Sequence, residues 1–238
     1  MEIVFLDTNL FYATILKNDA HHELATKTIE TLTRKGTPII IPEAVSRELR
    51  QSFYRKYLNA QSRIIHHYRK AIRHGLRNPQ EIFQYIQKET LEYANQYDRK
   101  SLNMYQYLLE YIQKNQLLSK ENRPQFAKLL SDHLIQLMSK IQPIEDRAIS
   151  LNLREEELEI YRDIYDKVGY LFKDEPDAEI FCQVASSVAT EGEDAKFILY
   201  TADREFSKTG TKAVEILNQE GYNINLEIRY LPEHPIQD

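Results

Sequence analysis

Three short runs of β-branched and aromatic residues constrain the fold of this chain more than any other feature. They cover residues 3–6 (IVFL), 38–41 (PIII) and 197–200 (FILY). Each run would be apolar on both faces of a strand, which is typical of strands buried in a parallel sheet. Residues 10–34 have helical character and supply the crossover that parallel pairing requires. An alternating run at residues 226–230 predicts an edge strand.

The middle of the chain has a different pattern. No glycine occurs between Gly75 and Gly169, and apolar residues recur there at helical spacing. Asn78 and Pro79 are typical of a helix cap followed by a first-turn proline. We therefore expect an α/β protein with a small parallel β-sheet flanked by helices, in three α/β/α layers, with an inserted α-helical region. The boundaries that we predict are 1–50 and 166–238 for the α/β domain and 51–165 for the insertion.

Composition excludes several classes of protein. Cys182 is the single cysteine, so the chain has neither a disulfide framework nor a cysteine-based metal cluster. The net charge of −5 argues against a chain that is basic throughout. The longest apolar runs are far shorter than the roughly 18 residues of a membrane span. We expect a cytoplasmic protein with no membrane partner.

Two aspartates follow strands directly. Asp7 closes the first apolar run and Asp203 follows the run at 197–200. Open α/β sheets bind ligands at the carboxyl ends of their strands, so adjacent strands would bring these carboxylates together. Each also has a simpler interpretation. Asp7 is a suitable cap for the helix that follows, and an aspartate after a strand is often a turn residue.

Two further acids are placed on helix faces that turn inward. Glu48 shares a face with Ala44 and Val45, and Asp177 shares one with Ile180 and Phe181. Several carboxylates buried together are unfavourable unless a cation neutralises them. Oxygen ligands without cysteine suit Mg²⁺ or Mn²⁺. The sequence therefore predicts one acidic metal-binding pocket formed by Asp7, Glu48, Asp177 and Asp203.

Four segments carry these acids in a characteristic order: 6–9 (LDTN), 46–49 (SREL), 177–180 (DAEI) and 201–206 (TADREF). Together they resemble the four-part signature of the PIN-domain nucleases. The resemblance covers about residues 1–50 and 170–230. It implies a Mg²⁺- or Mn²⁺-dependent endoribonuclease that hydrolyses single-stranded RNA by metal-activated water. Asp7, Glu48, Asp177 and Asp203 would be its metal ligands and catalytic acids, and Asn9 and Thr201 would support the ligands or touch the substrate.

The helical insertion is where the chain departs from the family pattern. In compact toxin-type members the glutamate helix leads almost directly to the helices before the third acid, so a simple toxin is disfavoured. The insertion resembles the helical arch of flap endonucleases, which keeps a structure-specific DNA nuclease open as an alternative. No helix-hairpin-helix segment follows Asp203.

The start of the insertion is strongly basic. Residues 50–80 contain no Asp or Glu, and Tyr54, Tyr57 and Tyr68 are interleaved with the cations. This combination suits phosphate contacts and base stacking, so we expect the stretch to bind single-stranded nucleic acid. The alternative is an exposed helix whose cations pair with acids such as Glu155–Glu157 and whose tyrosines pack inside. The predicted nucleic-acid-binding residues are Arg50, Arg55, Lys56, Arg63, Arg69, Lys70, Arg73 and Arg77.

Other functions stay open at this point. A PIN-like fold that has lost turnover would be a nucleic-acid- or protein-binding module, because fold does not guarantee chemistry. A phosphatase that acts on small molecules would use the same metals, but it would leave the basic helical insertion without a function. The sequence leaves open single-stranded DNA as a substrate, a homodimer, and control by an inhibitor protein.

Overall fold

The structure is a computed structural model, and it describes residues 2–191 and 195–236. Contacts between residues divide the chain into two compact units: unit 1 comprises residues 1–50 and 141–238, and unit 2 comprises residues 51–140. The predicted insertion also begins at residue 51. Residues 141–165, which we expected in the insertion, belong instead to unit 1.

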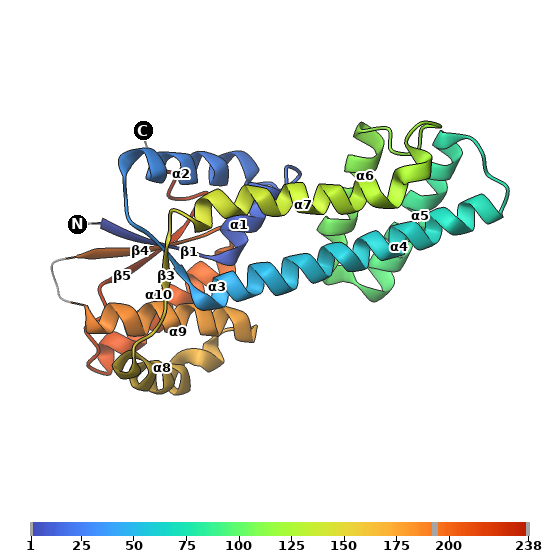
Figure 1. Cartoon of the computed structure of the whole chain (residues 1–238). Helices are drawn as coiled ribbons and strands as arrows, with labels where there is room; N and C mark the ends of the chain where they lie inside the picture. Colours follow the sequence, from blue (N-terminus) through green and yellow to red (C-terminus); the bar gives the residue numbers. More distant parts are fainter. Residues whose placement is uncertain (1, 192–194, 237–238) are drawn as a thin grey trace. The chain divides into compact units, whose positions relative to one another are not determined.

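Unit 1 is built on a parallel sheet of five strands in the order β3-β2-β1-β4-β5. The predicted fold class is confirmed, because helices flank this sheet in a three-layer α/β/α arrangement (Figure 1). The predicted strands at 3–6, 38–41, 197–200 and 226–230 all appear, with small shifts at their ends. The strands are β1 (Glu2–Leu6), β2 (Ile39–Pro42), β3 (Ile149–Leu151), β4 (Lys196–Thr201) and β5 (Leu226–Tyr230).

Strand β3 explains the shifted boundary of the insertion. It pairs with β2 through Ile40 and Ile149, Ile41 and Ser150, and Pro42 and Leu151. Sequence reasoning missed it because it has only three residues, of which two are exposed, so it shows no buried apolar run. Its hydrogen bonds come from a partner far away in the sequence, and that pairing brings residues 141–165 into unit 1.

The order of the strands reverses between β1 and β4. From β1 the chain moves outward to β2 and β3, and it then returns to the other side of β1 as β4 and β5. Helices α1 and α2 cover one face of the sheet, whereas α9 and α10 cover the other with α8 outside α9 (Figure 1). The helices of unit 1 are α1 (Thr8–Ile15), α2 (His22–Lys35), α3 (Glu43–Glu48), α8 (Glu155–Val168), α9 (Glu175–Thr190) and α10 (Arg204–Gln219).

The core of unit 1 lies between the sheet and these helices. Val4, Phe5 and Leu6 of β1 are at most 1% exposed, as expected for a strand buried on both faces. Gly210 allows α10 to approach the sheet, because a Cβ atom there would lie 3.3 Å from Ile228 Cγ1 and 3.5 Å from Phe181 Cδ2. The neighbouring interior strands β1 and β4 are therefore buried and closely packed, and they carry side chains at their carboxyl ends.

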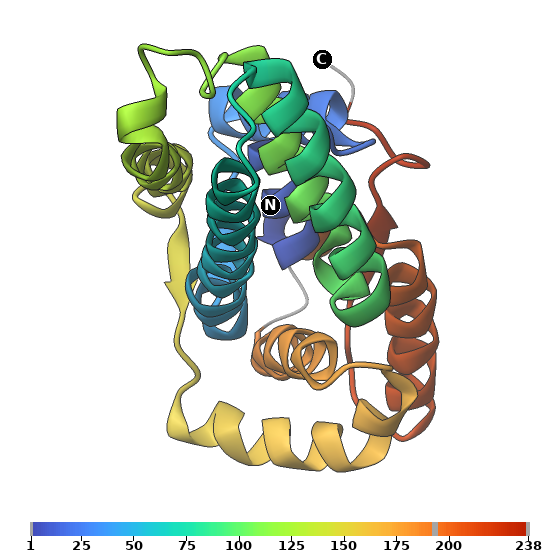
Figure 2. The same ribbon diagram turned by 90° about the vertical axis from the view of Figure 1, so that its right-hand side faces the viewer.

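Unit 2 is helical. Helices α4, α5 and α6 lie side by side (Figure 2), and Asn78 caps α5 ahead of Pro79 as the sequence predicted. A π-helical segment, Leu49–Phe53, leads into α4, and the last turns of α7 belong to unit 1. The helices are α4 (Tyr54–Arg73), α5 (Pro79–Tyr97), α6 (Leu102–Lys114) and α7 (Phe126–Glu145), with 3-10 turns at Arg99–Ser101 and Arg123–Gln125.

Candidate functional site

Asp7 lies at the carboxyl end of β1 and is fully buried. Its Oδ1 accepts a hydrogen bond from Thr8 N at 2.6 Å, and its Oδ2 accepts from Asn9 Nδ2 at 3.3 Å and from Thr201 Oγ1 at 2.7 Å. Asp7 therefore caps α1, which was the simpler interpretation of its sequence context. It also accepts hydrogen bonds from Asn9 and Thr201, the two residues that the resemblance to PIN-domain nucleases implies as its supporting residues.

Asp203 lies at the corresponding end of β4. Its Oδ1 accepts hydrogen bonds from Glu205 N at 2.8 Å and Phe206 N at 3.1 Å, so it caps α10. Its own backbone N–H donates to Thr201 Oγ1 at 2.9 Å. The Thr201 hydroxyl thus joins Asp7 to the backbone of Asp203. Both aspartates stand at the point where the strand order reverses, which is where open α/β sheets form their ligand crevices.

Helices α3 and α9 carry the other two acids, and two contacts hold these helices together. The Ala44 N–H at the start of α3 donates to Gln183 Oε1 at 3.0 Å, and Arg47 forms an ion pair with Glu179. Pro42, the cap residue of α3, provides no side-chain hydrogen bond, so Gln183 supplies this partner from α9. These contacts fix the ends of the helices that bear Glu48 and Asp177.

Electrostatic coupling links the four predicted acids. The pKa of Asp7 is raised to about 6, mainly by burial and also by the charge of Glu48, against the lowering effect of the Thr201 hydrogen bond. The pKa of Asp177 is raised to about 7, mainly by burial and also by the charges of Asp7, Asp203, Glu48 and Asp174. Like charges produce such shifts only when they lie close together.

Glu48 and Asp177 lack a partner in the part of the chain that the structure describes. Both side chains are half-buried, and neither forms a hydrogen bond or an ion pair with any residue that the structure describes. Asp203 Oδ2 likewise accepts no hydrogen bond within the described ranges. Carboxylates removed from water normally find a partner, so unpaired ones whose charges couple to the aspartates at the strand ends indicate a site that receives a ligand from outside.

The donor set fits a hard divalent cation, since it consists of carboxylate oxygens whose charges raise the pKa of Asp7 and Asp177. The side chains are not arranged as a finished metal cage. In residues 2–191 and 195–236, no three His, Cys, Asp or Glu side chains are grouped so that they could hold one ion. A cation would have to bring Glu48 and Asp177 toward the two aspartates, whose orientation the helix caps already set.

The basic residues fall into two groups. Several are engaged inside their own unit: Arg50 pairs with Glu145 at 3.5 Å, Lys70 pairs with Glu89 at 3.2 Å, and the Arg63 guanidinium lies 3.7 Å from the centre of the Tyr93 ring. Arg77 donates to backbone carbonyl groups at the end of α4, and Lys56 also has a partner. Four of the predicted residues form no hydrogen bond or ion pair with the described part of the chain: Arg63, which has only its ring contact, and Arg55, Arg69 and Arg73.

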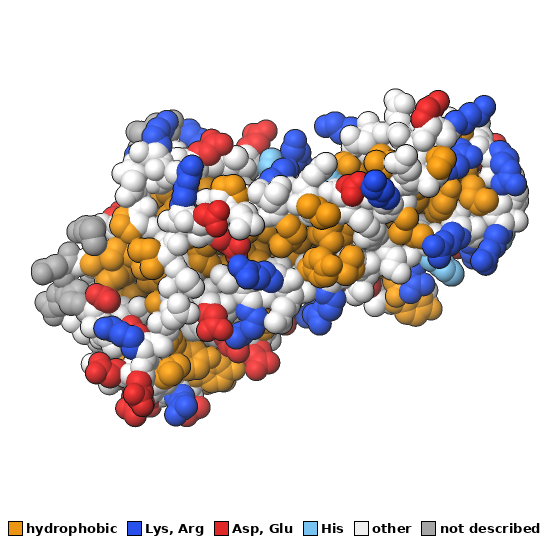
Figure 3. Space-filling view, viewed as in Figure 1, with side chains coloured by type: hydrophobic (Ala, Val, Ile, Leu, Met, Phe, Trp, Pro, Cys, Tyr) orange, Lys and Arg blue, Asp and Glu red, His pale blue; other side chains and the backbone are white. Residues whose placement is uncertain are grey.

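Arg69 and Arg73 are exposed near the end of α4. On the face shown in Figure 3, lysine and arginine side chains gather where α4 turns into α5. The tyrosines behave differently from our expectation. Tyr57 is fully buried and donates to the Leu130 carbonyl oxygen at 2.6 Å, so it is not available to stack on a base. Tyr68 packs on Phe126, and Tyr54 is 47% exposed.

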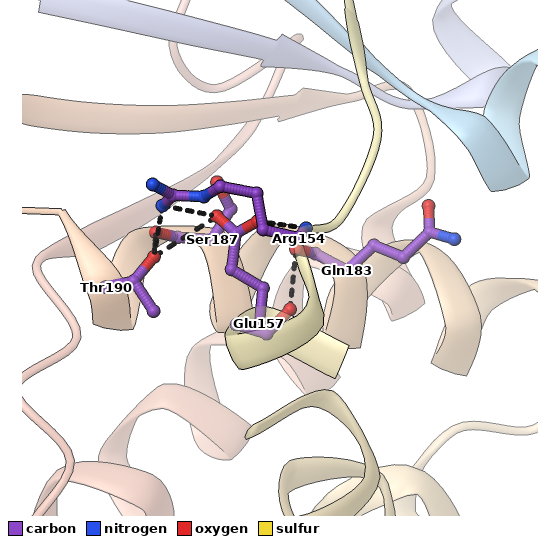
Figure 4. Close-up of polar contacts among 6 residues, drawn as sticks. Arg154, Glu157, Gln183, Ser187 and Thr190 are labelled. Atoms are coloured by element: carbon purple, nitrogen blue, oxygen red, sulfur yellow. Dashed lines mark hydrogen bonds and ion pairs between the residues drawn. The ribbon is translucent and has the colours of Figure 1, made fainter. Parts of the chain in front are cut away.

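Sequence reasoning missed one buried acid, Glu157, which it offered with Glu155 and Glu156 as a possible partner of the basic stretch. Glu157 is 3% exposed and accepts hydrogen bonds from Arg154 N at 2.5 Å, Arg154 Nη2 at 3.0 Å and Thr190 Oγ1 at 3.2 Å (Figure 4). These bonds tie the start of α8 to the end of α9. Because Glu157 is bonded within unit 1, it is not a partner for the basic stretch. The capping-box spacing from Arg154 to Glu157 was the available sequence signal.

Comparisons with family models, with curated proteins and with solved structures found no match for this chain. Among the described helices, none is both long and apolar enough to cross a membrane. The site therefore has to be interpreted from its own geometry and from the residues that the sequence brings to it.

Proposed function

We propose that this chain is a Mg²⁺- or Mn²⁺-dependent endonuclease of the PIN-like type that cleaves single-stranded RNA in the cytoplasm. One observation carries the proposal. Glu48 and Asp177 are half-buried carboxylates that form no hydrogen bond or ion pair with the described residues, and the charges of Asp7, Asp203 and Glu48 raise the pKa of Asp177 beside the switch point of the sheet. A cation would relieve this unfavourable accumulation of charge.

Each residue has a distinct part in this function. Asp7, oriented by Thr201 and Asn9, and Asp203, oriented by the amide groups of α10, form the fixed side of the site. Glu48 and Asp177 supply carboxylates from α3 and α9. The divalent cation, when bound, would polarise the phosphodiester, lower the pKa of water and stabilise the leaving oxygen. The phosphates of a single strand could accept hydrogen bonds from the guanidinium groups of Arg55, Arg69 and Arg73.

The choice of RNA follows the resemblance to PIN-domain ribonucleases, and single-stranded DNA is the competing substrate. A second candidate function is a PIN-like module that binds nucleic acid or protein without turnover. It is favoured by the finding that no three metal-ligating side chains in the described ranges are grouped around one ion position. A structure-specific DNA nuclease has no observation of its own in its favour.

The test is cleavage of end-labelled single-stranded RNA and DNA of mixed sequence by the full chain with Mn²⁺, Mg²⁺ or EDTA. Asp7→Asn should reduce cleavage about 100-fold or more, because loss of a ligand exceeds the effect of losing a supporting residue. Asparagine also caps helices well, so α1 should stay intact. Asp166→Asn, a change of the same type at an exposed position of α8, is the matched control and should cleave normally.

The outcomes separate the candidates. Metal-dependent cleavage that is lost in Asp7→Asn and kept in Asp166→Asn supports the nuclease and reveals its sugar preference. Tight RNA binding with no cleavage in either metal, unchanged by Asp7→Asn, would replace the nuclease with the binding module.

A further inference from the structure

Unit 2 contains a polar cavity of about 380 Å³, which is within the size range of small-molecule sites. Four of its lining residues are spaced i, i+3, i+4 and i+7 on α4, so they share one helix face. Tyr93 of α5, Asp98 at the end of α5 and Tyr105 of α6 complete the wall. The α4 residues are Asn59, Ser62, Arg63 and His66.

Arg63 is held in place without using its hydrogen-bond donors. Its guanidinium lies over the Tyr93 ring, 3.7 Å from the ring centre, and this cation–π contact orients the planar group. Arg63 forms no hydrogen bond and no ion pair with the part of the chain that the structure describes. A guanidinium has five N–H donors in a plane that matches phosphate oxygens. The cavity therefore presents an oriented cation whose donors are available to a ligand.

Asp98 provides the opposite charge in the same cavity. Its Oδ1 accepts from Ser101 Oγ at 2.9 Å, and its Oδ2 accepts from Tyr105 Oη at 3.2 Å. Tyr105 is 1% exposed, so one of these partners is part of the core. A carboxylate oxygen has room for a second donor. Asp98 forms no ion pair with Arg63 among the described residues, so neither charge satisfies the other.

We propose that this cavity binds one nucleotide of a single-stranded nucleic acid whose base carries an exocyclic amine. The phosphate would accept hydrogen bonds from Arg63, the base would stack on the free face of that guanidinium, and the amine would donate to Asp98. Cytosine, adenine and guanine carry such an amine, whereas uracil has carbonyl oxygens in its place and offers Asp98 only the N3–H between them. This inference rests on the proposed function, because that function brings a single strand to the protein.

The experiment measures how tightly the full chain binds three fluorescein-labelled oligonucleotides, each ten nucleotides long and made only of C, only of A or only of U. The measurement is made in EDTA, where no cleavage occurs. The wild type should bind the C or A oligomer about tenfold more tightly than the U oligomer, the discrimination expected of one good base contact. Arg63→Gln should weaken binding of all three. Lys114→Gln removes one charge at the exposed end of α6 and is the matched control. Asp98→Asn should remove the preference for amino bases.

Equal affinity for the three oligomers, with Arg63→Gln indistinguishable from Lys114→Gln, would overturn the pocket. That result together with cleavage that depends on Asp7 would leave the nuclease standing. Base-selective binding that is weakened for all three oligomers in Arg63→Gln, and that loses its selectivity in Asp98→Asn, supports the pocket even if no cleavage is found.

Discussion

The Thr201 hydroxyl acts on two acids at once. It donates to Asp7 Oδ2 at 2.7 Å and accepts from the Asp203 N–H at 2.9 Å, and it is fully buried. Its bond to Asp7 favours the charged carboxylate and partly opposes the larger effect of burial, and the net pKa of Asp7 is raised to about 6. Thr201 therefore makes Asp7 ionise more readily near neutral pH than burial alone would allow.

Replacing Thr201 with valine keeps the shape of the side chain and removes the hydroxyl. We expect the pKa of Asp7 to rise above about 6. The acidic limb of the pH profile for metal-dependent cleavage should then shift to higher pH. Thr201→Ser keeps the hydroxyl and is the control. A carboxyl titration followed by NMR checks the same shift without activity, and an unchanged titration would contradict this role.

At the scale of elements, the contact between α8 and α9 depends on a buried carboxylate. Burial raises the pKa of Glu157, but the hydrogen bonds and charge of Arg154 outweigh burial, so the pKa lies below its ordinary value of 4.5. A group with a lowered pKa stabilises the fold at neutral pH, and this contribution is lost as the pH falls through and below about 4.5.

Glu157→Gln should lower the free energy of unfolding by roughly 1–3 kcal/mol at pH 7, because the bonds to Arg154 lose their charge. Glu156→Gln is the matched control, since its side chain is exposed at the adjacent position and should change stability little. Urea unfolding of the two variants at pH 7 and pH 4 measures the effect. Equal stability of both variants at pH 7 would show that the buried cluster contributes nothing.

At the scale of the whole molecule, the raised pKa values predict how stability depends on pH. The pKa values of Asp7 and Asp177 are raised from 3.8 to about 6 and about 7 in the folded chain. Between pH 4 and 7 the folded state therefore binds more protons than the unfolded state. Stability from these groups is present at low pH and is lost as the pH rises through their folded pKa values.

Asp177→Asn removes one of these ionisations. In EDTA at pH 8 the variant should be more stable than the wild type by about 1 kcal/mol or more, a rise of roughly 2–4 °C in Tm for a chain of this length. The difference should shrink toward pH 5, and Mn²⁺ should stabilise the wild type alone. Thermal unfolding across this pH range checks the prediction. A variant less stable than the wild type at pH 8 would contradict the electrostatic account.

Much of unit 1, and the cap of α5 in unit 2, could be predicted because the signals are local. The strands other than β3 appear as apolar runs, and Asp7 and Asp203 follow their strands directly. The Asn78 and Pro79 cap of α5 likewise depends on adjacent residues. Position along a strand determines which end of the sheet a residue occupies. The sequence therefore determined the α/β class and the placement of two acids at the strand ends.

Tertiary structure decided the features that depend on distant partners. Strand β3 exists through its pairing with β2, and that pairing placed residues 141–165 in unit 1. The buried Glu157 depends on α9, whose Thr190 hydroxyl donates a hydrogen bond to it. The buried Tyr57 depends on α7, whose Leu130 carbonyl oxygen accepts a hydrogen bond from it. The strand order, which creates the switch point between β1 and β4, is likewise absent from any local pattern. Residue type and spacing set what each segment becomes, whereas burial and pairing depend on contacts that close only when the chain folds.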